Sequence, residues 1–166
     1  EGTTSYLKNN VAKTKDGGGI YLNALASLTV SGMGTKLVVN GNTALNLGGG
    51  RGGGVAAFSA ATVMVSSGAH LDVTNNKALT HGGGFFLANE GTRLDIHGEG
   101  THLIVRENEA KVNGGGLALR AGAVLRVTAP SMFQGNTAIE GRGGGIAYDD
   151  NSGLQDGGSS CVRLSL

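Results

Sequence analysis

The stretch MFQGNTAIEGRGGGIAY, residues 132–148, contains the two marks that decide the fold of this chain. The first mark is Asn-x-Ala, with an apolar residue three positions before the Asn. The second is a glycine triplet followed by an alternating apolar segment. Both marks occur five times, and successive triplets begin 29 to 35 residues apart, which is the signature of a repeat protein. The recurring Asn residues are Asn10, Asn42, Asn76, Asn108 and Asn136, and the central glycines of the triplets are Gly18, Gly53, Gly83, Gly115 and Gly144.

Each repeat contains short segments in which apolar and polar residues alternate, which is typical of strands that bury one face. The first segment follows the triplet, the second begins nine or ten residues past it, and the third leads into the Asn. Three strands per repeat predict one coil of a three-sided solenoid, in which each strand pairs in parallel with its counterparts in neighbouring coils. We expect right-handed winding, because crossovers between parallel strands strongly prefer that hand.

The predicted fold class is therefore all-β: a right-handed parallel β-helix of about five coils, forming a single domain over residues 1–166. The expected divisions are a partial coil 1–16, coils 17–51, 52–81, 82–113 and 114–142, and a degenerate last coil 143–166. At one corner the triplets permit positive φ and a turn too tight for a Cβ. At another corner we expect the stacked Asn side chains to bond to one another and to turn backbone, with the following Ala pointing into the crowded corner.

Composition excludes several other classes. Glycine supplies 32 of the 166 residues and proline only one, and glycines in triplets without proline exclude collagen. No apolar run approaches the ~18 residues of a membrane span. Thirteen basic and twelve acidic side chains give a net charge of +1 without a basic block, which argues against nucleic-acid or anionic-membrane binding through charge. The single Cys161 cannot form a disulfide within the chain.

The paired marks resemble the repeats of the chlamydial polymorphic membrane proteins, in which FxxN recurs with GGA followed by Ile, Leu or Val. The segment Phe133-Gln134-Gly135-Asn136 matches FxxN in full, and Gly143-Gly144-Gly145-Ile146 follows it in the right order. The other four copies have Leu or Val in place of Phe, and all five have Gly where that family prefers Ala. The resemblance covers nearly the whole chain and implies a surface-displayed or secreted, adhesin-like passenger, with no activity implied.

The outward side chains offer little for catalysis. Enzymes on right-handed β-helices need an Arg or several carboxylates on one face, with two acids close together. We expect no outward column with two acids, and we expect Asp95 and Arg126 to form a surface ion pair. We therefore predict that the chain is not an enzyme and binds no cofactor. The expected outward columns are Thr29, Met64, Asp95, Arg126 and Gln155 for the second strand, and Val38, Asp72, Ile104, Met132 and Arg163 for the third.

Two groups of polar residues are candidates for metal sites. His97 and His102 flank the second corner of one coil, but the HExxH and CxxC spacings are missing. An acidic cluster lacks the glycine and terminal Glu of an EF-hand, so a solvated turn is the favoured interpretation and we predict no metal site. This cluster comprises Asp149, Asp150, Asn151 and Asp156.

The outward column of the first strand is uncharged and comprises Tyr21, Ala56, Phe86, Ala118 and Ala147. We call it the contact ribbon. A continuous apolar strip is more often a contact site, which predicts lateral packing or contact with a partner. The alternative is an ordinary sheet covered by loops.

The chain begins near one third strand, residues 6–11, and stops near another, residues 161–166. Because open strand edges pair, we expect either a slice of a longer β-helix or a rod that stacks end to end into a filament. The predicted function is a non-catalytic, extracellular or cell-surface structural or adhesive β-helix. Its expected partners are further copies of itself, a host or surface protein, or a glycan. The alternative is a carbohydrate-binding or carbohydrate-cleaving β-helix with its site in loops.

Overall fold

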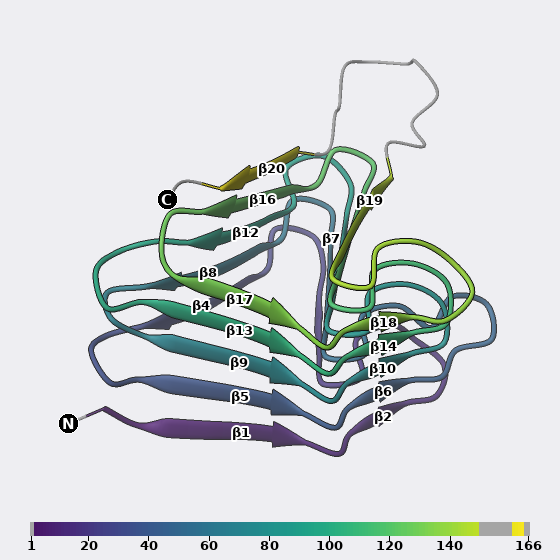
Figure 1. Cartoon of the computed structure of the whole chain (residues 1–166), viewed down its shortest axis with the longest axis horizontal. Helices are drawn as coiled ribbons and strands as arrows, with labels where there is room; N and C mark the ends of the chain where they lie inside the picture. Colours follow the sequence, from purple (N-terminus) through teal and green to yellow (C-terminus); the bar gives the residue numbers. More distant parts are fainter. Residues whose placement is uncertain (1, 150–160, 165–166) are drawn as a thin grey trace.

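The computed structural model describes residues 2–149 and 161–164, and every regular element in this part of the chain is a β-strand. These strands form four parallel sheets of five strands that wind around one axis as a β-solenoid (Figure 1). The coils climb in a right-handed sense from β1 (Thr4–Lys8) towards β20 (Cys161–Leu164). The predicted parallel β-helix is therefore confirmed. Within the described residues there is no helix of the length and apolarity needed to cross a membrane.

Three sheets form the long sides of the coil, and each collects one of the predicted strands from every repeat. The first-strand sheet contains β3 (Ile20–Leu22), β7 (Val55–Phe58), β11 (Phe85–Ala88), β15 (Leu117–Arg120) and β19 (Ile146–Asp149). The second-strand sheet contains β4 (Ser27–Ser31), β8 (Thr62–Ser66), β12 (Arg93–Ile96), β16 (Val124–Val127) and β20. The third-strand sheet contains β1, β5 (Lys36–Asn40), β9 (His70–Thr74), β13 (His102–Arg106) and β17 (Ser131–Gln134).

A fourth sheet, the corner sheet, departs from the predicted three-sided cross-section. It is made of two-residue strands that directly follow the recurring Asn. Two residues are too few to produce an alternation of apolar and polar side chains, so periodicity does not predict a strand here. Its strands are β2 (Val11–Ala12), β6 (Thr43–Ala44), β10 (Lys77–Ala78), β14 (Glu109–Ala110) and β18 (Thr137–Ala138).

The last strand lies on a different side from the one predicted. β20 pairs with β16, so Arg163 stands beside Arg126 on the second-strand sheet and not in the third-strand column. Val162 and Leu164 are in register with Leu125 and Val127, and this alternation of apolar residues suits either sheet equally well. A period of two identifies a strand but does not say which side of the coil it occupies. Gln155 lies outside the described residues.

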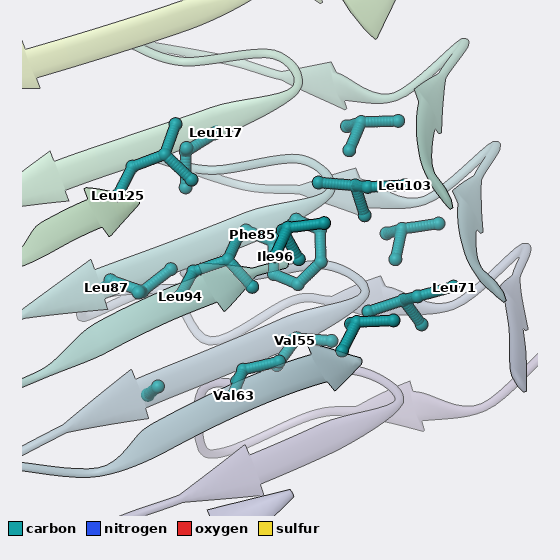
Figure 2. Close-up of a cluster of buried hydrophobic side chains, with 14 of the residues drawn as sticks. Val55, Val63, Leu71, Phe85, Leu87, Leu94, Ile96, Leu103, Leu117 and Leu125 are labelled. Carbon is teal, nitrogen blue, oxygen red and sulfur yellow. The ribbon is translucent and has the colours of Figure 1, made fainter. Parts of the chain in front are cut away.

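The core runs along the axis and is filled by the inward residues of the three long sheets (Figure 2). Successive coils contribute equivalent layers, and all of the side chains named at the end of this paragraph are fully or almost fully buried. Burying an aliphatic or aromatic side chain of this size stabilises the fold by about 1.5–3 kcal/mol. One coil supplies Val55, Val63 and Leu71, the next supplies Phe85, Leu94 and Leu103, and Leu117 and Leu125 lie above them.

The glycine corner explains why three glycines recur together. The first glycine has a positive φ in every coil, for example +65° at Gly114. The middle glycine has no room for a side chain, because a Cβ at Gly115 would collide with the backbone of Thr137. The N–H groups of Gly115 and Gly116 donate to carbonyls of the next triplet at 3.1 and 2.9 Å. The triplets therefore extend the parallel ladder of backbone hydrogen bonds around the corner.

Candidate functional site

The five recurring Asn residues lie in single file at the corner between the third-strand sheet and the corner sheet. In each of the first four, the backbone N–H and the Nδ2 of the Asn both donate to the Oδ1 of the Asn in the next coil. For Asn76 these two bonds to Asn108 measure 2.9 and 3.0 Å. The same pair of bonds joins Asn10 to Asn42, Asn42 to Asn76, and Asn108 to Asn136.

A second bond from Nδ2 accounts for the spacing of the first sequence mark. The Nδ2 of Asn76 donates to the carbonyl of Val39, which stands three residues before the Asn of the preceding coil, at 2.9 Å. Asn42, Asn108 and Asn136 make the equivalent bonds to Leu7, Val73 and Val105. Every polar atom of the Asn76 side chain is thus used within this Asn ladder, which satisfies buried groups that would otherwise be costly. The Asn residues have a structural role.

The predicted contact ribbon is aligned in register, but its middle is not on the surface. Ala56, Phe86 and Ala118 are neighbours on adjacent strands and are 0%, 0% and 2% exposed. The loops from the corner sheet curve over the outer side of the first-strand sheet and cover it (Figure 1). The prediction of a continuous contact surface is therefore wrong for these three residues. Tyr21 remains 47% exposed, and Ala147 is partly exposed.

The covered residues form an aromatic cluster outside the main core. Phe58 comes from the adjacent outward column and packs between Tyr21 and Phe86. Its ring centroid lies 5.6 Å from that of Tyr21 and 5.5 Å from that of Phe86. Large and small side chains of this cluster alternate from strand to strand, since Phe86 lies between Ala56 and Ala118 on the neighbouring strands. This alternation lets the rings interleave along the rod.

Arg51 covers this aromatic cluster. Its guanidinium carbon lies 5.0 Å from the ring centroids of both Phe58 and Phe86. The buried carboxylate of Asp16 holds it through Nη2 at 2.8 Å and Nε at 3.3 Å, and also accepts the Arg51 backbone N–H at 2.9 Å. Sequence reasoning missed both residues, although Arg51 is the one charged residue within the glycine-rich run 48–54. The hollow beside it has a volume of about 230 Å³, below the ~300 Å³ at which ordinary ligand pockets begin.

A larger hollow lies on the outer face of the second-strand sheet. Its volume is about 350 Å³, and it is lined by Asp95, Ile96, His97, Arg126 and Thr128. We call it the polar hollow. The register places Asp95 beside Arg126, as the sequence predicted, but the expected ion pair between them is not formed. Asp95 instead accepts from Nε of Arg93 at 3.2 Å, because residues two apart on a strand share a face.

The two histidines that are candidates for a metal site, His97 and His102, make separate contacts. His97 lines the polar hollow, whereas the ring of His102 packs on His70 with centroids 4.8 Å apart. The Nδ1 of His102 is 2.9 Å from the carbonyl oxygen of Gly100. Within the residues that the structure describes, no group of three or more His, Cys, Asp or Glu side chains is arranged to hold a metal ion. Asp150, Asn151 and Asp156 of the acidic cluster lie outside that part of the chain.

The two acids named in the strand columns lie on different faces, as predicted. Asp72 is on the third-strand sheet, where Nζ of Lys36 is 2.5 Å from its Oδ2, and Asp95 is on the second-strand sheet. Each carboxylate is thus balanced by a cation from its own face or strand.

No family model, curated protein or solved structure matches this chain.

Proposed function

We propose that this chain is a non-catalytic, extracellular β-helix that serves as a stiff structural or adhesive rod at a cell surface. It acts either as part of a longer surface passenger or by stacking end to end into a filament. A parallel β-helix suits this role, because each coil contacts only its neighbours and the rod lengthens without a change of cross-section.

One observation carries the proposal: the positions that recur in every coil are all used to build the rod. The recurring Asn forms the Asn ladder, the glycines close a corner, and the Ala after each Asn fills the space inside. Outward positions, in contrast, change from coil to coil, as at Thr29, Met64 and Asp95. The recurring residues thus hold the coils together, whereas the outward residues differ from coil to coil. Such a chain is suited to displaying different side chains on a rigid support.

Negative-stain microscopy and cell binding test the proposal together. We expect purified full chain to form short rods or filaments, and beads coated with it to adhere to cells more strongly than beads coated with the Asn76→Ala variant, whose Asn ladder is broken. Single chains should look compact, because five coils about 4.8 Å apart span only about 24 Å along the axis, and irregular aggregates in place of single chains or filaments would contradict the rod. Turnover of acidic or neutral polysaccharides at enzymatic rates would contradict the non-catalytic assignment.

Carbohydrate binding is the second candidate function, and the polar hollow is the observation that favours it. The hollow combines a carboxylate, a guanidinium, an imidazole and a hydroxyl within about 350 Å³, and such convergent polar groups are typical of small-ligand sites. Cleavage of a glycosidic bond ordinarily needs a pair of carboxyl groups. The polar hollow is lined by one, Asp95, which is already paired with Arg93. The hollow therefore favours binding over hydrolysis.

A further inference from the structure

We propose that the polar hollow binds an acidic saccharide, with Arg126 taking the carboxylate or sulfate group and Asp95 and Thr128 taking neighbouring hydroxyls. The inference rests on the adhesive function proposed above and names the chemical class of the partner. No sequence motif marked this site, because its residues come from two coils and none of them recurs.

The backbone places the four polar side chains at the corners of a small rectangle. Asp95 and His97 lie two residues apart along one coil, and Arg126 and Thr128 occupy the matching positions in the next. The N–H of Thr128 donates to the carbonyl of Ile96 at 2.8 Å, which continues the register beyond the strand. Adjacent strands are about 4.8 Å apart, and residues two apart on one strand about 6.6 Å. One sugar ring with its substituents fits such a rectangle.

The charges in the hollow favour an anionic group at Arg126. The carboxylate of Asp95 is balanced by Arg93, whereas Arg126 is exposed and forms no ion pair among the described residues. With respect to the described residues, an entering oxyanion therefore meets a guanidinium that has no ion-pair partner, and its planar fork suits two parallel hydrogen bonds to carboxylate or sulfate.

Two comparisons within the molecule show that the site is local. In earlier coils the positions equivalent to Asp95 are Met64 and Thr29, which carry no charge. The arginine that covers the aromatic cluster, Arg51, is neutralised by Asp16, and its hollow is smaller. Of these two hollows, the polar hollow has the larger volume, and its arginine has no ion-pair partner among the residues that the structure describes.

The remaining groups match a sugar better than a bare anion. Asp95 keeps acceptor capacity beyond its single 3.2 Å contact with Arg93, since a carboxylate has about four lone-pair sites. The hydroxyl of Thr128 makes only a long 3.4 Å bond to the carbonyl of Ile96, so it is able to exchange this bond for one to a ligand. An acceptor and a hydroxyl beside a guanidinium suit a ring that carries both hydroxyls and an acidic group.

Fluorescence polarisation with labelled hexasaccharides tests the inference on the full chain. The probes are a heparin-derived hexasaccharide for sulfate, hexagalacturonate for carboxylate, and maltohexaose as the neutral control. We expect at least one acidic probe to bind and the neutral probe not to bind, with affinity falling as salt is raised. Binding of one acidic probe alone identifies which oxyanion Arg126 prefers. Equal binding of the neutral probe would overturn the inference, as would the absence of binding by both acidic probes at millimolar concentration.

The decisive variant is Arg126→Gln, with Arg106→Gln as its matched control. Arg106 is also exposed, lies on the third-strand sheet and is 3.6 Å from Glu107, so its loss changes the net charge equally on a different face. Loss of a hydrogen bond to a charged group predicts about ten- to hundredfold weaker binding for Arg126→Gln and little change for Arg106→Gln. Equal effects would show that only overall charge matters and would overturn the site. Unchanged melting temperatures verify that both variants are folded.

The bead-adhesion assay separates the two proposals. If beads adhere to cells although no acidic saccharide binds, this inference fails while the adhesive function stands. If acidic saccharides bind through Arg126 but the beads do not adhere, the site stands and the adhesive function fails.

Discussion

Replacing Asn76 by Ala should destabilise the rod strongly, because Asn76 serves buried groups in the coils on both sides of it. Its Oδ1 accepts the N–H and the Nδ2 of Asn42, and its own Nδ2 donates to the carbonyl of Val39. Asn42 and Asn76 are 0% and 1% exposed, so water cannot replace these bonds. The Nδ2 of Asn42 keeps its bond to the carbonyl of Leu7, so two groups lose their partner: the N–H of Asn42 and the carbonyl of Val39. Each buried group left without a partner costs about 1–3 kcal/mol, and two such groups sum to about 2–6 kcal/mol. This is comparable with the ~5–15 kcal/mol that stabilises a typical domain.

The same substitution at Asn10 is the matched control. Asn10 stands on the same ladder but is exposed, and its side chain contributes one bond, from Nδ2 to the Oδ1 of Asn42. That oxygen keeps its bond from the backbone N–H of residue 10, so the expected cost is about 0.5–1.5 kcal/mol. Urea unfolding followed by far-ultraviolet circular dichroism gives both values. Equal shifts of the unfolding midpoint for the two variants would refute the view that the buried Asn ladder holds this corner.

Three further substitutions test the glycine corner and the aromatic cluster. Gly116→Ala should lower the melting temperature more than Gly145→Ala, since an added Cβ would lie 2.5 Å from the Gly145 carbonyl oxygen in the first case and would meet no described atom within 4 Å in the second. Equal melting would show that the corner relaxes. Arg51→Ala should cost about 1–3 kcal/mol in urea unfolding, because it removes the cation packed on two rings and leaves the buried Asp16 unpaired. An unchanged free energy of unfolding would mean that solvent compensates for both the lost cation–ring contacts and the unpaired carboxylate. Phe86→Ala should cost about 3–5 kcal/mol in the same assay, and a cost below about 1 kcal/mol would separate the aromatic cluster from the cooperative fold.

The sequence alone is sufficient to predict those structural features that recur in every coil. A hydrogen bond between Asn76 and Asn108 requires the same residue at the same place one coil later, so the structural requirement is itself a pattern in the sequence. The same holds for the inward residues Val39, Val73 and Val105, which pair in register and reveal the strand by alternation. The parallel β-helix could therefore be predicted without homologues.

Features that occur once were beyond the reach of this reasoning. The alternation of Tyr21 and Phe86 showed correctly which face they share, but not that a loop carrying Arg51 folds over them. The register placed Asp95 beside Arg126, yet the choice of Arg93 as partner depends on side-chain rotamers. Loop paths and rotamers are set by three-dimensional packing that a single sequence does not display. The polar hollow depends on both, which is why the sequence pairs Asp95 with Arg126 and singles out His97 but does not join them into one site.

The Asn ladder also gives the molecule a direction. Each side chain accepts at its oxygen from the Asn of the preceding coil and donates one Nδ2 hydrogen to the Asn of the following one, as Asn76 does between Asn42 and Asn108. Any additional coil that prolongs this row must therefore approach with the same orientation, because a reversed one would set oxygen against oxygen or N–H against N–H. Growth of such a structure is vectorial: units add head to tail or do not continue the row.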